Sequence, residues 1–196
     1  VKQFPVGAVS HARDVVVDAQ RNRAYVSATG ADYISVFDTR TLQQLDNITI
    51  ASGKRGETFT PGSLDIDTAT GKVYTVSLAA AEAAIIDGAS GKVEKVFPLA
   101  GARDAIGVAW NPVAKRLLVV SQGSDNLLIV GPVTAKGEHD VYVGAGSLNV
   151  SYSPSTRLAY VSNRAAGTVT VVDEGGKIVA NLDGGTYPNH VSKGPD

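Results

Sequence analysis

Eight residues of the chain are of types that together can hold an anionic ligand that carries aromatic bases. Arginine neutralises phosphate groups, and an aromatic ring offers a face on which a base can stack. These residues lie in polar segments between apolar runs, where loops are expected. We therefore predict a rim that binds a ligand or nucleic acid, formed by His11, Arg13, Phe59, Arg103, Asn163, Arg164, Asn189 and His190.

Acidic residues lie in the same loops and weaken the positive potential that a phosphate backbone would meet. The chain has 18 basic and 19 acidic residues and a net charge of −1, so it has no overall electrostatic footprint for nucleic acid or anionic lipid. Solvated loops without a ligand are the alternative interpretation. The acidic residues of these loops are Asp14, Asp32, Glu82, Asp104 and Asp125.

Other residues that suggest chemistry are better explained by structure. Asp38, Asp87 and Asp173 directly follow apolar runs, so we expect their carboxylates to accept hydrogen bonds from turn amides. Trp110 occupies a position that is apolar in every repeat, which predicts a core residue. The histidines are far apart in the sequence, and no catalytic or nucleotide-binding motif is present. We predict no catalytic residue, no metal site and no cofactor.

Composition narrows the class of protein further. The chain has 196 residues, 43% of them hydrophobic, which is normal for a chain that buries a core. Cysteine is absent, which rules out disulfides and thiolate chemistry. No apolar run is long enough to span a membrane, so we expect no membrane insertion. No charged-then-apolar leader opens the chain, so we expect any signal peptide to be absent or already removed.

A repeat is the strongest pattern in the sequence. Four anchor residues at 49-, 44- and 42-residue spacings are Tyr25, Tyr74, Leu118 and Tyr160. The residue thirteen positions after each anchor closes an apolar run, and a turn former stands seven residues before each anchor. Constant offsets with variable gaps indicate one repeated unit with outer loops of different length. We expect the anchors to be buried in central strands.

Each unit holds three short runs rich in β-branched and aromatic residues, followed by a fourth amphipathic run. This predicts an all-β chain of four-stranded antiparallel blades, because such sheets bury both faces only by stacking on neighbours in a propeller. The predicted repeats cover approximately residues 7–50, 51–100, 101–144 and 145–186, with innermost strands at 15–17, 64–66, 108–110 and 150–152. We expect residues 1–6 to be the outer strand of a preceding blade, and 187–196 to begin a following one.

The repeat resembles the YVTN-type β-propeller repeats of bacterial cell-envelope proteins, in particular the YncE-like periplasmic propellers. The resemblance rests on Ala-Tyr-Val-Ser at 24–27 and at 159–162. It also rests on Ile-Ser-Val-Phe-Asp-Thr at 34–39, on Val-Thr-Val-Val-Asp at 169–173, and on Tyr-Pro-Asn-His at 187–190. It departs in the third repeat, where Leu118 replaces tyrosine and Gly131-Pro132 replaces the Asp-Thr type ending.

The resemblance implies a seven-bladed ring, of which the chain is a part that needs further blades or other chains for closure. It also implies a periplasmic or cell-envelope location and a non-enzymatic binding function, with single-stranded DNA, another macromolecule or a small ligand as the partner. A lactonase-like propeller enzyme and a purely structural assembly module are the alternatives. The motif indicates the fold more specifically than the function, because propellers host many functions.

Overall fold

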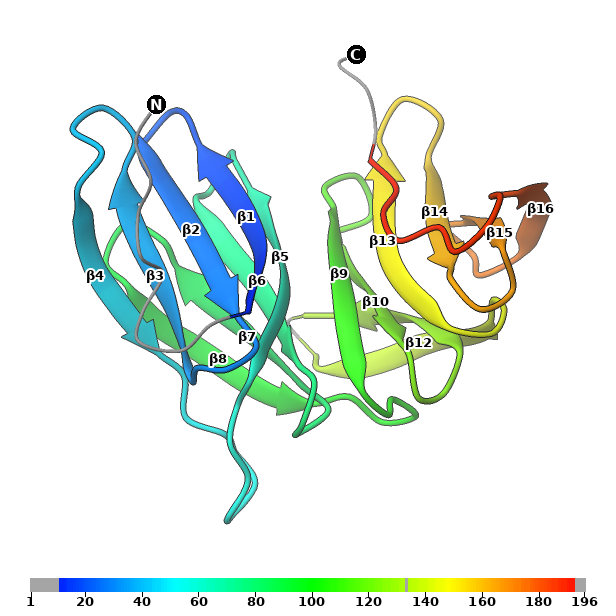
Figure 1. Ribbon diagram of the computed structural model, residues 1–196, viewed down its shortest axis with the longest axis horizontal. Coiled ribbons are helices and arrows are strands. Elements are labelled where there is room, and N and C mark those ends of the chain that lie inside the picture. Colours follow the sequence, from blue (N-terminus) through cyan, green and yellow to red (C-terminus); the bar gives the residue numbers. More distant parts are fainter. Residues whose placement is uncertain (1–10, 133, 193–196) are drawn as a thin grey trace. The chain divides into compact units, whose positions relative to one another are not determined.

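The computed structural model describes residues 11–132 and 134–192, which form four sheets of four antiparallel strands each (Figure 1). Every sheet is built from four consecutive strands in chain order. The sheets group into two compact units, unit 1 within residues 1–98 and unit 2 within residues 99–196. This confirms the predicted all-β class and the four-stranded antiparallel blades.

Unit 1 contains the first two sheets. The first sheet consists of β1 (Ala12–Asp18), β2 (Arg23–Ala28), β3 (Tyr33–Asp38) and β4 (Gln44–Thr49). The second consists of β5 (Pro61–Asp67), β6 (Lys72–Ser77), β7 (Glu82–Asp87) and β8 (Lys92–Pro98). The first strands of the two sheets, β1 and β5, lie side by side (Figure 1).

Unit 2 contains the third and fourth sheets. The third consists of β9 (Ala105–Asn111), β10 (Arg116–Ser121), β11 (Asn126–Gly131) and β12 (Lys136–Tyr142). The fourth consists of β13 (Ser147–Ser153), β14 (Leu158–Asn163), β15 (Thr168–Asp173) and β16 (Ile178–Asp183). Here β9 and β13 are the neighbouring first strands. In both units the predicted innermost runs therefore lie where the sheets meet.

The aspartates that end the third strands of their sheets close turns, as predicted. Asp38 Oδ1 accepts hydrogen bonds from the backbone amides of Arg40 (2.8 Å) and Thr41 (2.7 Å). These bonds from Thr41 and Arg40 stabilise the charged form and lower the pKa of the Asp38 carboxyl. Asp173 Oδ1 accepts equivalent bonds from the amides of Gly175 and Lys177, both at 2.9 Å. Their role is to satisfy turn amides.

The core of unit 1 lies between its two sheets. Tyr25 is fully buried, and its hydroxyl donates a 2.8 Å hydrogen bond to the carbonyl of Gly88 in the turn after β7. Ser27, two residues along β2, donates to the carbonyl of Gly62 at 2.6 Å. Around them apolar side chains of both sheets form one cluster, which includes Ile34 and Leu64. The side of β2 that carries Tyr25 therefore faces the second sheet.

The core of unit 2 has the same arrangement with different residues. Leu118 takes the anchor position of the third sheet and packs in a buried cluster with Val150 and Val161 of the fourth. The hydroxyl of Ser147 joins the sheets by a 3.0 Å bond to the carbonyl of Ser121. Trp110 is only 8% exposed, which agrees with the predicted core position.

One anchor prediction is wrong. Tyr160 is half-buried, although the other three anchor residues are buried. Its neighbours Ala159 and Val161 belong to the cluster that faces the third sheet, so alternation along β14 directs Tyr160 to the opposite side of the fourth sheet. Tyr25 is buried because the second sheet covers the corresponding side of the first.

A polar clamp joins the sheets of unit 2 at the turns beyond β9 and β15. The carboxylate of Glu174 accepts hydrogen bonds from Asn111 Nδ2 (3.1 Å), the Tyr152 hydroxyl (2.6 Å) and Arg157 Nε (3.0 Å). Desolvation acts to raise the pKa of Glu174, but the bonds from Tyr152 and Arg157 outweigh it and the pKa is lowered. Desolvation and the Glu174 carboxylate raise the pKa of Tyr152 to about 12.

The clamp predicts an acid-sensitive unit 2. Because folding lowers the pKa of Glu174 from its ordinary 4.5, its stabilising contribution is complete above that value and is lost as pH falls through the folded pKa. Urea unfolding monitored by Trp110 fluorescence should show a smaller loss of stability below pH 4.5 in Glu174→Gln than in the parent chain. Glu57→Gln, at an exposed position, is the control, and an equal effect of both variants would contradict the assignment.

One predicted segment lies outside the described residues, and another lies partly outside them. Residues 1–6 lie outside the described residues, as do 193–196 of the predicted following blade. Residues 187–192 are described and carry no strand. The described residues include no helix of the length and apolar character that crossing a membrane requires.

Candidate functional site

Hydrogen bonds connect the loops at one end of unit 2. The Arg103 amide donates to Ser124 Oγ at 3.1 Å, and the Arg103 guanidinium bonds to the carbonyl of Gly123. Asp125 accepts a 2.7 Å bond from the amide of Gly146. These bonds bring together the loops that precede β9, β11 and β13. We call this region the unit 2 loop end, comprising residues 101–104, 122–125, 144–146, 163–167 and 184–191.

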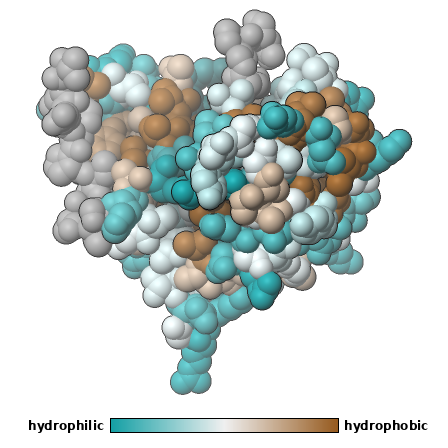
Figure 2. Space-filling view, turned by 45° about the vertical axis from the view of Figure 1, so that its right-hand side comes forward, coloured by the Kyte–Doolittle hydropathy of each residue, from teal (hydrophilic) through white to brown (hydrophobic). Residues whose placement is uncertain are grey.

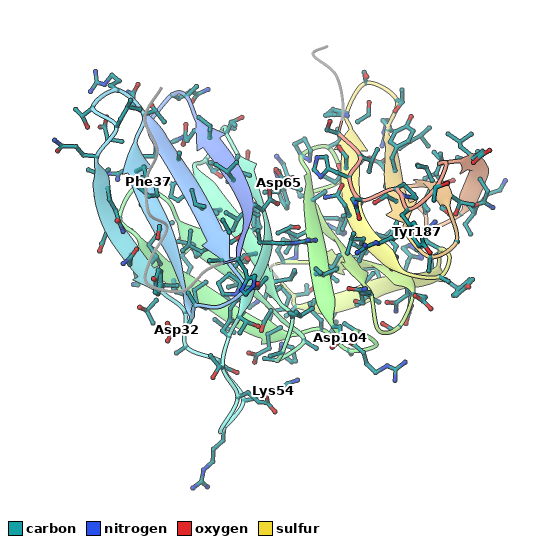
Figure 3. The ribbon with its side chains drawn as sticks, in the orientation of Figure 1. Asp32, Phe37, Lys54, Asp65, Asp104 and Tyr187 are labelled. Atoms are coloured by element: carbon teal, nitrogen blue, oxygen red, sulfur yellow. The ribbon has the colours of Figure 1, made fainter. Side chains whose placement is uncertain are left out.

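Arg164 and Tyr187 form a cation–π pair at the unit 2 loop end. The Arg164 amide donates to the carbonyl of Gly146 at 2.9 Å, which places the residue beside the preceding loop. Its guanidinium carbon lies 5.9 Å from the centre of the Tyr187 ring. Tyr187, labelled in Figure 3, is part of the fourth sheet's loop region. Its side chain is 64% exposed, and its φ is 54°. The pair therefore presents a cation and an aromatic face to solvent.

The segment that carries Tyr187 is held against the fourth sheet. The amide of Val191 donates to Asn149 Oδ1 at 3.0 Å, and Asn149 is itself buried in β13. Asn189 and His190 lie between Tyr187 and Val191 in the chain, and both are exposed. The structure thus places Arg103, Arg164, Asn189 and His190 at one end of unit 2.

Asn163 is not available as a rim residue. Its side chain is fully buried, and Nδ2 donates to the carbonyl of Val143 at 2.9 Å and to Thr170 Oγ1 at 2.8 Å. Within the described residues its Oδ1 has no hydrogen-bond partner. The amide connects β14 to the end of the preceding sheet instead of facing a ligand. This corrects the predicted exposure of Asn163.

His11 and Arg13 lie at the start of β1 in unit 1. His11 is exposed with a φ of 89°, and its carbonyl accepts a 3.1 Å bond from the amide of Thr29. Arg13 is half-buried, and the adjacent Asp14 accepts a 3.0 Å bond from the amide of Leu64. Both residues belong to the loop end of unit 1. That they share one rim with the arginines of unit 2 stays a prediction.

Phe59 is buried, contrary to the prediction of a stacking face. It is 1% exposed and packs with Tyr25, Ile34 and Ile50 in the core of unit 1. The chain between β4 and β5 returns toward the sheets at this point, and burial of the ring holds the end of the loop. Phe59 therefore cannot stack on a base.

Unit 1 has a basic loop that contains none of the predicted rim residues. Residues 52–57 project from the sheets, with Lys54 near the base and a hydrophilic tip (Figures 2 and 3). Buried Glu82 holds this loop by accepting bonds from Ser52 Oγ (2.8 Å) and the Gly53 amide (3.3 Å). Exposed Arg55 follows Lys54. The 49-residue spacing between the first two anchors, the longest of the three, is the signal that could have revealed it.

The exposed side chains of these loops are of types that can bind anionic and planar groups. A guanidinium can neutralise phosphate, and the exposed ring of Tyr187 can stack on a planar group. The exposed carboxylate of Asp104 lies beside Arg103 and reduces the local positive charge. Among residues 11–132 and 134–192, no three side chains of histidine, aspartate or glutamate are placed to hold a metal ion.

Curated relatives match most of the chain. The YncE protein of Salmonella typhi is 29% identical over 190 residues, which cover 94% of this chain and 51% of that protein. The YncE protein of Salmonella typhimurium is 28% identical with the same coverage. The chain thus spans about half the length of these relatives. No protein-family profile matches the chain.

Solved structures share the fold at low sequence identity. Hydrazine synthase of Kuenenia stuttgartiensis aligns with a TM-score of 0.77 and 13% identity, covering 92% of this chain and 51% of that one. Virginiamycin B lyase from Staphylococcus aureus gives 0.71 and 13%, with coverage of 86% and 54%. A streptogramin B lyase gives 0.75 and 9%, with coverage of 90% and 56%. Together with the sheets described above, these likenesses show that the chain consists of β-propeller blades, and in sequence it is similar to the YncE proteins.

Proposed function

We propose that the chain is part of a non-enzymatic binding propeller whose unit 2 loop end holds single-stranded DNA. The supporting observation is the Arg164–Tyr187 pair, with a guanidinium 5.9 Å from an exposed ring. Aromatic rings accept stacked bases of any identity, while arginines neutralise the phosphates between them. Arg103 supplies a second positive charge at the same end.

The proposed binding is weak and strongly dependent on salt. The chain is nearly neutral, and carboxylates such as that of Asp104 lie beside the arginines. Each phosphate that a cation neutralises contributes about −0.7 to the slope of log affinity against log salt for single strands. Arg164→Ala should therefore make this slope less steep by about 0.7, and Arg40→Ala, at an exposed turn of unit 1, should leave it unchanged.

Stacking is tested separately from charge. Tyr187→Leu removes the aromatic face, and base stacking on such a residue contributes about 1–3 kcal/mol, so affinity should fall by about 5- to 150-fold. Tyr142→Leu is the matched control, because Tyr142 is 66% exposed but lies on the outer strand β12. The measurement is fluorescence anisotropy of a labelled single-stranded oligonucleotide at several salt concentrations.

Two results would contradict the proposal. One is the absence of saturable binding at low salt, and the other is an equal loss of affinity in the Tyr187 and Tyr142 variants. The likeness to streptogramin lyases concerns the fold alone, so it assigns no catalytic residue to this chain. The resemblance to envelope repeats supports a periplasmic or cell-envelope location as part of the proposal.

A further inference from the structure

The basic loop of unit 1, residues 52–57, stands away from the two sheets that it joins. It connects β4 to β5, and its tip is hydrophilic (Figures 1 and 2). Every residue from 53 to 58 is exposed. At Gly56, which has a φ of 81°, a Cβ would meet no atom within 4 Å. An enzyme can therefore reach the backbone of this loop.

Arg55 lies at the exposed tip, and its side chain is free to be bound. Within residues 11–132 and 134–192, no hydrogen bond or ion pair involves its guanidinium. Lys54 differs, because its Nζ bonds to the carbonyl of Ala80. Serine proteases with an aspartate in the specificity pocket recognise a free basic side chain of this kind. The loop thus has the side chain that such a protease selects.

The backbone of the loop can adopt the form that a protease cleft needs. A protease binds several substrate residues in an extended form, so exposed loop tips are cut before paired strands. Residues 53–58 belong to no strand. A backbone hydrogen bond from the amide of Glu57 to the carbonyl of Lys54, 3.2 Å long, closes the tip. Opening this turn frees the segment around Arg55.

Both ends of the loop are fixed, so the tip can open while unit 1 stays folded. Ile50 before the loop and Phe59 after it are each 1% exposed and pack in the core cluster. Buried Glu82 holds Ser52 and Gly53 by the two bonds described above. Cleavage at the tip therefore leaves the cluster and the sheets intact.

Arg40 shows why an exposed arginine is not by itself a good cleavage site. It lies in the turn after β3, where its amide and that of Thr41 donate to Asp38 Oδ1 at 2.8 and 2.7 Å. The amide of Leu42 also donates to the Asp38 carbonyl at 2.9 Å. These bonds hold the turn closed, and cleavage of a closed site follows the small population of its open form.

We propose that the peptide bond between Arg55 and Gly56 is a site of limited proteolysis by an arginine-specific serine protease. As this bond breaks, water supplies a hydroxyl to the carbonyl carbon of Arg55 and a hydrogen to the nitrogen of Gly56. The products are residues 1–55, which end in a carboxylate, and residues 56–196, which begin with an amino group. The first sheet belongs to one product and the second sheet to the other.

The two products remain bound to each other after the cut. The Tyr25 hydroxyl bonds to the carbonyl of Gly88, and the carboxylate of Asp14 accepts a 3.0 Å bond from the amide of Leu64. Each of these bonds joins the first sheet to the second, and the apolar cluster lies between the sheets. The cut thus converts unit 1 into an assembly of two chains, whose stability depends on protein concentration.

Trypsin at a low ratio to the chain tests the site, with the masses of the products measured over time. Because closed sites are cut only when they open, cleavage after Arg55 should be about tenfold or more faster than cleavage after Arg40. Arg55→Gln should slow cleavage of the loop by about tenfold or more, since the remaining Lys54 is held by Ala80. Lys54→Gln should leave the rate unchanged. Arg40→Gln is the matched control, because it removes an exposed arginine outside the loop.

Size-exclusion chromatography of the cut chain tests whether the products stay together. We expect them to elute as one species in buffer and to separate only in urea. Faster cleavage at another site in the described part of the chain would overturn the proposal, as would equal effects of Lys54→Gln and Arg55→Gln. Separation of the products without denaturant would overturn the assembly of two chains.

Discussion

Tyr25→Ala should lower the free energy of unfolding of unit 1 by about 3–5 kcal/mol, the range found when large buried aromatic residues are truncated. Tyr25 is fully buried among apolar side chains of both sheets, so removing its ring leaves a cavity at the centre of the cluster. The lost hydroxyl also leaves the buried carbonyl of Gly88 without its 2.8 Å bond.

Urea unfolding followed by circular dichroism measures this loss. Tyr25→Phe keeps the ring and removes only the hydrogen bond, so it should cost about 1–3 kcal/mol. Tyr142→Ala, at a 66% exposed position, should stay within about 0.5 kcal/mol of the parent chain. If Tyr25→Ala lowered the free energy of unfolding no more than Tyr142→Ala does, the conclusion that Tyr25 packs between the first and second sheets would be wrong.

Gly107→Val should destabilise unit 2 by about 3 kcal/mol or more, through overpacking between β9 and β13. A Cβ at Gly107 would lie 2.6 Å from Val120 Cγ2, 3.0 Å from the carbonyl oxygen of Leu148 and 3.2 Å from the Cα of Asn149. The last two atoms are backbone of the neighbouring sheet. They can move only if the two sheets separate, which exposes the cluster between them.

Trp110 lies three residues from Gly107, so its fluorescence reports unfolding of the affected region in urea. Gly137→Val is the matched control, because a Cβ at this β12 position meets no atom within 4 Å. It should leave stability unchanged or raise it slightly, since valine suits a strand better than glycine. Equal midpoints for Gly107→Val and the parent chain would show that the sheets are not closely packed at Gly107.

The strands could be predicted from sequence because their determinants are local and repeated. The apolar runs, the aspartates that close turns and the anchor residues recur at constant offsets, and each offset is set within a few residues of chain. Asp38 illustrates this, since the amides it accepts belong to Arg40 and Thr41 in the same turn.

The site was predicted less well because burial of a loop residue depends on the path of the whole loop. Phe59 lies in a polar segment, but that segment returns over Tyr25 and Ile34 of the first sheet, which are remote in sequence. Asn163 is buried by a bond to Val143, twenty residues earlier. The exposure of Arg103 and Arg164 could be predicted without knowing the loop path, because long charged side chains in loops are rarely fully buried without a partner.

The consecutive order of strands in every sheet also determines how the chain can fold during synthesis. The first sheet is complete in sequence at Thr49, before any strand of the second has been made. Pairing of this kind joins residues close in the chain, so each sheet can form with a small entropic cost of loop closure. Until β5 to β8 emerge, however, the side of the nascent first sheet that carries Tyr25 has no neighbour. That apolar side therefore stays in contact with water during synthesis until the second sheet is made and packs on it.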